Sequence, residues 1–320
     1  MSVGKAVRAG LIASVAALFG VLVAGCGGQD RGSIAEEYRI GGTQQTVRLA
    51  VGSKDFTEQE ILGEITLQAL RAAGAETIDR TGTGDTEAVR RALVSGEIDM
   101  YWEYTGTGWL VHLARPDPIA DPEEQYVAVR DADLEGNGIV WLPQAPANNT
   151  YALATRADEF GDVQNISDLE GLFTQGDTTL CVGPEFGQRA DGLPGMEDHY
   201  GFDFPEESVS VLSDSTVYGA LEEGSRCDFG SVFATDGRVD ASGLRLLEDD
   251  GGFFAAYNPS LNMTSETLEL YPELENLFAD IAVGLDTATL RELSAAVDVD
   301  GQTPEQVAGD WLAGEGYTAE

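Results

Sequence analysis

The feature that most constrains the fold is a regular alternation of strand-like and helix-like segments at the start of the folded region. In chain order we expect strand 46–51, loop 52–56, helix 57–74, strand 76–80, helix 85–95 and strand 98–104. Helices that connect successive strands in this way are typical of a mainly parallel sheet, so the order predicts an α/β fold. Ligands of such sheets bind at the carboxyl ends of the strands.

The helix predicted over 57–74 has a clear start and a clear apolar face. Thr57 followed by Glu60 has the spacing of a capping box. Ile61, Leu62 and Ile65 continue at helical spacing.

The strand 98–104 ends in Glu103-Tyr104 and is followed by Thr-Gly-Thr-Gly, residues 105–108. We interpret these four residues as a turn that opens a helix at 109–113. The free backbone N–H groups of such a helix favour an anion, and Tyr104 would place an aromatic ring beside them. The segment therefore suits a zwitterion that carries a bulky cation and a carboxylate.

The rest of the chain predicts a second α/β lobe and a helical return to the first. Residues 115–147 are rich in Pro and Asp and are expected to be less regular, with a short strand at 139–142. The expected elements that follow are crossover strand 148–154, helix 166–173, strand 179–182, helix 215–223, strand 228–233, turn 235–238, return segments 244–247 and 253–257, and helices 268–281, 286–297 and 303–314. We place lobe I at 46–148 and 254–320 and lobe II at 149–253.

The first 26 residues have the pattern of an export signal. Lys5 and Arg8 precede an apolar stretch that is short for a membrane span, and the stretch ends in Val-Ala-Gly-Cys at 23–26. This ending resembles the lipobox of bacterial lipoproteins, which implies a lipid anchor on Cys26. Residues 27–45 are expected to form a flexible tether. The predicted location is extracytoplasmic, anchored to the outer face of the cell membrane.

Charge excludes one class of partner. The chain has 56 acidic and 18 basic residues and a formal net charge of −38. Nucleic acid binding requires clustered Lys and Arg, so we expect no nucleic acid partner. Most of these carboxylates are expected to form a solvated acidic surface.

The chemistry-bearing residue types are sparse. After Cys26, only Cys181 and Cys227 remain, and they form either a disulfide or two buried thiols. His112 and His199 are isolated in the sequence. No metal-ligand spacing, Gly-rich nucleotide loop or nucleophile elbow is present, so we expect no metal, no cofactor and no catalytic residue.

Five side chains are candidates for ligand binding on their own chemistry. Lys54 is the only lysine after the export signal, and its compact ammonium indicates either a specific anion partner or a surface residue retained by chance. Tyr104, Tyr151 and Tyr218 stand at loop or helix starts, where aromatic rings either attract quaternary ammonium groups or simply pack. Arg189 has a guanidinium suited to a carboxylate, although a surface ion pair is the commoner role.

Several of these motifs occur together in one known family. The segments 52–59 (Gly-Ser-Lys-Asp-Phe-Thr-Glu-Gln), 99–107, 149–151, 185–192 and 235–238 resemble those of the glycine betaine/choline-type osmoprotectant-binding proteins of ABC importers. The resemblance covers nearly all of 47–320. It implies a two-lobed class II periplasmic-binding-protein fold with the ligand in the cleft between the lobes, and ABC permease subunits as partners.

The resemblance also implies residue roles. Lys54, Thr107 and Arg189 are expected to hold a carboxylate, and Tyr104, Tyr151 and Tyr218 to form a cage for a trimethylammonium group. Where the family often has another cage tyrosine, this chain has Ser242, so we expect a cage that is open on one side.

Two other functions remain as alternatives. A secreted lipoprotein hydrolase could use carboxylates such as Asp99 or Glu103, although no activated nucleophile can be identified. A sensory or permease-fused domain is the second alternative.

Overall fold

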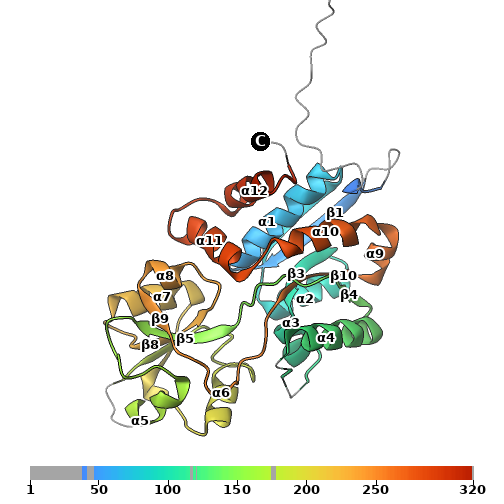
Figure 1. Cartoon of the computed structure of the whole chain (residues 1–320). Coiled ribbons are helices and arrows are strands. Elements are labelled where there is room, and N and C mark those ends of the chain that lie inside the picture. Colours follow the sequence, from blue (N-terminus) through green and yellow to red (C-terminus); the bar gives the residue numbers. More distant parts are fainter. Residues whose placement is uncertain (1–37, 42–46, 116–117, 120, 174–177, 319–320) are drawn as a thin grey trace, which may run out of the picture. The chain divides into compact units, whose positions relative to one another are not determined.

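The computed structural model describes residues 38–41, 47–115, 118–119, 121–173 and 178–318 (Figure 1). The predicted export signal, the lipobox with Cys26 and most of the predicted tether lie outside the described residues. No helix in the described part of the chain is both long enough and apolar enough to cross a membrane.

The strands form two five-stranded sheets. The first has the order β2-β1-β3-β10-β4, with β1 (Arg48–Lys54), β2 (Glu76–Gly84), β3 (Met100–Tyr104), β4 (Ile139–Trp141) and β10 (Pro259–Thr264). The second has the order β7-β6-β8-β5-β9, with β5 (Tyr151–Arg156), β6 (Leu180–Val182), β7 (Val209–Val211), β8 (Phe229–Phe233) and β9 (Leu244–Leu246). We call the part built on the first sheet lobe I and the part built on the second lobe II.

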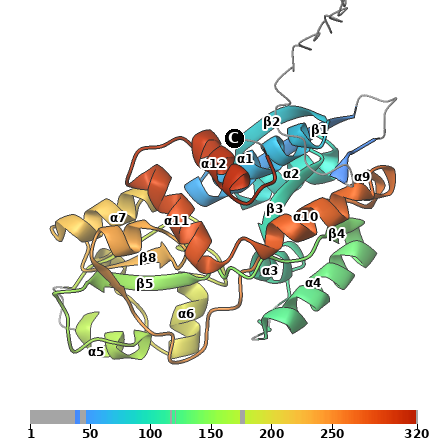
Figure 2. The same ribbon diagram turned by 45° about the horizontal axis from the view of Figure 1, so that its top comes forward.

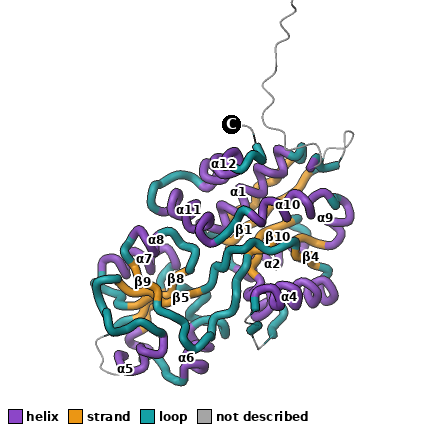
Figure 3. Tube along the Cα trace, in the orientation of Figure 1, coloured by secondary structure: helices purple, strands orange, loops and turns teal. Residues whose placement is uncertain are grey.

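In each sheet one strand runs against the other four. β10 pairs antiparallel with both β3 and β4, and β5 pairs antiparallel with both β8 and β9. These two are the strands that the chain enters after crossing from one sheet to the other. The crossing segments, 142–150 and 247–258, are loops without helices (Figure 3).

Helices cover both faces of each sheet. In chain order they are α1 (Thr57–Ala72), α2 (Thr86–Ser95), α3 (Thr105–Thr107), α4 (Pro122–Asn137), α5 (Glu170–Phe173), α6 (Leu193–Tyr200), α7 (Asp214–Glu223), α8 (Arg238–Ala241), α9 (Ser265–Leu270), α10 (Glu273–Val283), α11 (Thr287–Asp298) and α12 (Pro304–Gly314). A π-helix follows α3 at Gly108–His112, and short 3-10 helices lie at Ile166–Leu169 and Glu206–Ser208.

Apolar side chains fix which helices cover which face. In lobe I, α1, α10, α11 and α12 share one core with the sheet, and α2 and α4 share a second core with Tyr101 and Trp141. In lobe II, α5 and α6 lie on one face and α7 and α8 on the other (Figures 1 and 2). Each sheet is therefore buried on both sides, as expected for α/β folds.

Several local predictions are wrong. Residues 52–54 belong to β1 and not to a loop, and the helix predicted over 268–281 is interrupted at Pro272. The predicted capping box of Thr57 is absent, because the Thr57 hydroxyl donates to Asp298 Oδ1 at 2.7 Å. Within the segment predicted as a tether, Ile40 is buried against lobe I and its backbone N–H donates to Ala73 O.

Helix α4 lies in the region that was expected to be irregular. Asp121 caps it by accepting from the backbone N–H groups of Glu123 and Glu124, and Pro122 occupies its first position. The Pro and Asp residues that suggested a loop are therefore helix-start signals.

The Thr-Gly-Thr-Gly segment is helical and does not form a turn. A Cβ on Gly106 would lie 2.6 Å from the Tyr257 ring, and one on Gly108 would lie 2.4 Å from the Trp141 ring. Both glycines are thus required by close approach of aromatic side chains. Two backbone N–H groups at the start of this segment are engaged within the chain: Tyr104 N–H donates to Glu103 Oε1, and Thr105 N–H donates to Asn258 O.

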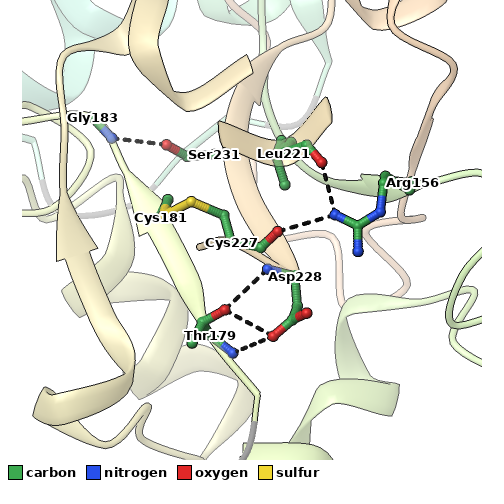
Figure 4. Close-up of a disulfide and its surroundings, with 8 residues drawn as sticks. All are labelled: Arg156, Thr179, Cys181, Gly183, Leu221, Cys227, Asp228 and Ser231. Carbon is green, nitrogen blue, oxygen red and sulfur yellow. Dashed lines mark hydrogen bonds between the residues drawn. A yellow bond between two sulfur atoms is a disulfide. The ribbon is translucent and has the colours of Figure 1, made fainter. Parts of the chain in front are cut away.

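Lobe II contains a disulfide between Cys181 and Cys227, with an S–S distance of 1.94 Å and a Cα–Cα distance of 5.6 Å (Figure 4). Cys181 lies in β6, and Cys227 lies just before β8, which pairs parallel with β6. Thr179 and Asp228 exchange hydrogen bonds beside it (Figure 4). Of the two alternatives for these cysteines, the structure contains the pair.

Candidate ligand-binding cavity

A cavity of about 410 Å³ is lined by side chains of both lobes. From lobe I it receives residues that follow β1 and β3, and from lobe II residues that follow β6 and β8. β1 runs parallel to β3, and β6 runs parallel to β8. The cavity therefore lies at the carboxyl ends of these strands, where α/β sheets bind their ligands. Five of the six predicted ligand residues line this cavity together: Lys54, Tyr104, Thr107, Tyr151 and Arg189.

Aromatic rings form one side of the cavity. Phe56 from lobe I stacks on Phe233 from lobe II, with ring centroids 5.5 Å apart and planes at 10°. Phe56 also stacks on Tyr104 at 6.3 Å, and Phe233 on Tyr151 at 5.1 Å. Tyr257 meets Tyr151 edge-on at 5.9 Å. The rings therefore form a continuous aromatic wall that spans both lobes.

Tyr218 is not part of this wall, which corrects the prediction. It is 2% exposed in α7, and its hydroxyl accepts a hydrogen bond from the backbone N–H of Phe233. The guanidinium of Arg238 covers its ring at 4.0 Å. Phe233, the last residue of β8, lines the cavity, whereas Tyr218 does not.

Ser242 also lies outside the residues that line the cavity. It follows α8, and its hydroxyl donates to Glu222 Oε2 at 3.2 Å. The serine therefore does not open one side of an aromatic cage.

Lys54 is buried and paired within lobe I. Its ammonium lies 2.6 Å from Glu103 Oε1, and the two side chains are 6% and 0% exposed. Glu103 Oε2 accepts from the Tyr101 hydroxyl at 2.9 Å and lies 2.7 Å from His112 Nε2. Burial alone would raise the pKa of Glu103, but Lys54 and His112 together hold it well below its usual range.

Arg189 is likewise engaged by carboxylates of its own chain. Its guanidinium donates to Glu185 Oε2 at 2.8 Å and to both oxygens of Asp191, and lies 3.5 Å from the Thr107 hydroxyl. Glu185 also accepts from the N–H and hydroxyl of Thr86, at 3.0 and 2.9 Å. Because of these contacts, a ligand carboxylate reaches Arg189 only in competition with Glu185.

The cavity is acidic. Among the described residues that line it are seven carboxylates and three cations: Asp55, Glu58, Glu60, Asp85, Glu185, Asp214 and Asp236 against Lys54, Arg189 and Arg238. Burial, together with the nearby Glu185 and Asp55, raises the pKa of Asp214 to about 6. The charge balance favours a cationic ligand group.

The carboxylates of the hydrolase alternative are structurally occupied. Asp99 accepts from the backbone N–H of Ala50 at 2.6 Å and does not line the cavity, and Glu103 is saturated by the contacts above. In the described part of the chain no group of three His, Cys, Asp or Glu side chains could hold a metal ion.

Sequence reasoning missed Phe56, Phe233, Tyr257 and the buried acid Glu58 as lining residues. Phe56 and Glu58 belong to the Lys-Asp-Phe-Thr-Glu-Gln motif, and Phe233 ends a strand that was predicted. The rule that ligands lie at strand ends could have found both phenylalanines. Tyr257 lies in a crossing loop and reaches the cavity only through the packing of the two lobes.

Comparison with known proteins agrees with the geometry. The family described as the substrate-binding domain of ABC-type glycine betaine transport systems matches residues 47–314. A glycine-betaine-binding protein of Pseudomonas aeruginosa is 38% identical over 281 residues, which are 85% of this chain and 89% of that protein. The glycine betaine-binding protein YehZ of Escherichia coli is 35% identical over 276 residues, 84% of this chain and 90% of the relative.

Solved structures have the same fold. Apo YehZ of Escherichia coli has a TM-score of 0.64 at 34% identity, covering 86% of this chain and all of that one. A glycine betaine/carnitine/choline ABC transporter structure has a TM-score of 0.70 at 24% identity, covering 84% of this chain and 99% of that one. The predicted two-lobed α/β fold is confirmed, and the chain belongs to the family of substrate-binding domains of ABC-type glycine betaine transport systems.

Proposed function

We propose that this protein captures a small quaternary ammonium solute outside the cytoplasm and delivers it to the permease subunits of an ABC importer, without catalysing a reaction. The observation that carries the proposal is the acidic cavity with its aromatic wall of Phe56, Tyr104, Tyr151 and Phe233. A quaternary ammonium group cannot donate a conventional N–H hydrogen bond and is attracted by ring faces and by negative charge. Relatives named for binding glycine betaine and carnitine support this ligand class.

The polar side of the cavity would contact the rest of the solute. Lys54, Thr107 and Arg189 stand there beside Glu103 and Glu185. A zwitterion's carboxylate can bind Lys54 and Arg189 only by sharing them with these protein carboxylates.

The domain division and the attachment to the membrane are part of the same proposal. Lobe I at 46–148 and 254–320 and lobe II at 149–253 are supported by the two sheets and the two crossing loops. The lipid anchor on Cys26 is supported by the Val-Ala-Gly-Cys sequence, and residues 27–37 would form the tether.

Replacing Phe233 with leucine is expected to weaken binding of glycine betaine and choline about two- to thirty-fold, the range for one cation–π contact. Isothermal titration calorimetry on wild type and variant measures the effect. Phe202→Leu is the matched control, because Phe202 packs in the lobe II core without lining the cavity. Equal losses for both variants would contradict the proposed site, and wild type that binds neither solute would contradict the proposed function.

Binding of a quaternary ammonium cation is expected to tighten about three- to ten-fold between pH 5 and pH 7.5. Asp214, with a pKa of about 6, is mostly neutral at the lower pH and adds a negative charge to the cavity as the pH rises. Titrations with choline at both pH values measure the change. Asp214→Asn should remove most of the difference; an unchanged pH dependence in this variant would assign the effect to another group.

A further inference from the structure

The Thr-Asp-Gly-Arg motif at 235–238 has neighbours outside the cavity. Thr235, Asp236 and Arg238 line the cavity, whereas Gly237 does not. The motif leads into α8, and α11 of lobe I lies against α8 and approaches the lobe II helices in both ribbon views (Figure 1, Figure 2). The motif therefore connects the cavity to a contact between the two lobes.

The two lobes approach each other backbone to backbone at Gly237. A Cβ built on this glycine would lie 2.5 Å from Ala295 Cβ in α11 and 2.7 Å from the backbone N and Cα of Ala295. Gly237 has φ −64° and ψ −21°, values that any residue adopts. The glycine is thus required by the approach of α11 and not by its own conformation.

Polar side chains surround this close approach. Arg291 of α11 donates to Ala234 O at 2.5 Å, and its other terminal nitrogen lies 3.4 Å from Asp240 Oδ2. Arg238 Nε lies 3.4 Å from Asp298 Oδ2, at the end of α11. Each of these contacts joins a residue of lobe I to a residue of lobe II, so they form only where the lobes meet.

The contact has the composition of a surface that can separate. The nearby apolar side chains belong to separate cores, with Leu293 in the core of lobe I and Val239 in the core of lobe II. Arg291 Nε and Ser294 Oγ, on the same face of α11 as Ala295, are buried without a hydrogen-bond partner in the described part of the chain. Buried unpaired polar atoms weaken a contact, and movable interfaces between domains are typically polar.

From these observations we infer that Gly237 and α11 form a closing contact between the lobes, and that Gly237 sets the affinity for solutes through this contact without touching them. The apparent affinity of a ligand falls with the fraction of protein that can adopt the binding arrangement. Gly237 is therefore a positioning residue that acts equally on every solute of the cavity. The inference rests on the proposed function and goes beyond it, because it assigns a role in affinity to a residue outside the cavity.

Gly237→Ala tests the inference by adding only the Cβ that α11 excludes. The variant should bind glycine betaine and choline about ten-fold more weakly or worse, and by the same factor, because no cavity residue is changed. Isothermal titration calorimetry measures both affinities. The loss should come from faster release of the solute, measured by stopped-flow fluorescence, since the first encounter does not require the closing contact.

Two further variants make the test specific. Gly219→Ala is the matched control, because it adds the same atom to helix α7 of lobe II, where a Cβ would have nothing within 4 Å; it should bind both solutes as wild type does. Arg291→Met removes the donors to Ala234 and Asp240 and should weaken both solutes equally, by about two- to ten-fold. Thermal melts without solute should give each variant a midpoint close to that of wild type.

The outcomes separate the inference from the proposed function. If Gly237→Ala binds as wild type does, or weakens only one of the two solutes, the inference is overturned while the proposed function stands. A lowered melting temperature of Gly237→Ala with unchanged affinity would make the contact a permanent part of the fold, which also overturns the inference. So would an equal loss of affinity in Gly219→Ala.

Arg291→Met decides the case in which Gly237→Ala does not fold. An equal weakening of both solutes in Arg291→Met would then support the inference, and wild-type affinity for both would overturn it. If wild type binds neither glycine betaine nor choline, both the inference and the proposed function fail.

Discussion

Glu103→Ala is expected to lower the free energy of unfolding by about 3–5 kcal/mol, the typical cost of removing one partner of a buried ion pair. The substitution leaves the Lys54 ammonium, 5% exposed, without its partner at 2.6 Å. It also removes the acceptor of the Tyr101 hydroxyl. Urea unfolding at neutral pH measures the change.

Two variants make this result specific. Glu97→Ala removes an exposed acid from the loop that leads into the same strand, and should change stability by no more than about 0.5 kcal/mol. Glu103→Ala combined with Lys54→Met removes both charges and should recover much of the loss. A double variant no more stable than Glu103→Ala alone would show that the ion pair is not the origin of the effect.

The Lys54–Glu103 ion pair is also expected to make the stability of the protein depend on pH in the acid range. The pKa of Glu103 is lowered in the folded protein, so the folded state binds fewer protons than the unfolded state near the ordinary glutamate pKa of about 4.3. Its contribution is fully present above that value and is lost as the pH falls below it. In Glu103→Ala the loss of stability between pH 5 and pH 3 should be smaller than in wild type.

Lys54, Glu103 and Tyr104 also show how much of the site could be predicted from the sequence. The strand-helix order predicted that a ligand binds at the carboxyl ends of the strands, and Lys54 and Tyr104, which end β1 and β3, both line the cavity. Sequence spacing cannot reveal that Glu103, one residue before Tyr104, points to Lys54. Strand alternation puts Glu103 and Tyr104 on opposite faces, but which face carries Lys54 depends on how β1 packs beside β3.

The fold class was predictable because it depends on periodicity. Strand-helix alternation identified β1, β2, β3 and the helices between them, and it identified β6, α7 and β8 in lobe II. Strand β10 was missed because its pairing with β3 and β4 joins residues more than a hundred positions apart. Tyr218 was misplaced for a related reason: it lies on a predicted helix, but the packing of Arg238 over its ring covers it.

Replacing both Cys181 and Cys227 with alanine is expected to lower the free energy of unfolding by about 4 kcal/mol. The cysteines are 46 positions apart, and a cross-link across a loop of that length restricts the unfolded chain by roughly that amount in the chain-entropy account. Both side chains are buried, at 0% and 1% exposure, and alanine adds no polar group to the lobe II core. Urea unfolding of the variant and of wild type, with and without a reductant, measures the effect. The reductant should destabilise wild type and leave the variant unchanged.

The location of the disulfide predicts what does not change. Cys181 and Cys227 lie in the core shared by α7 and the lobe II sheet and do not line the cavity. Well below its unfolding transition, the variant should therefore bind the same solute with the same affinity as wild type. Thiol labelling of unfolded, unreduced protein in which Cys26 is replaced by serine should find no free thiol. Two labelled thiols per chain would show that Cys181 and Cys227 are not bonded. Equal stability of the double-alanine variant and wild type would show that the disulfide does not stabilise lobe II.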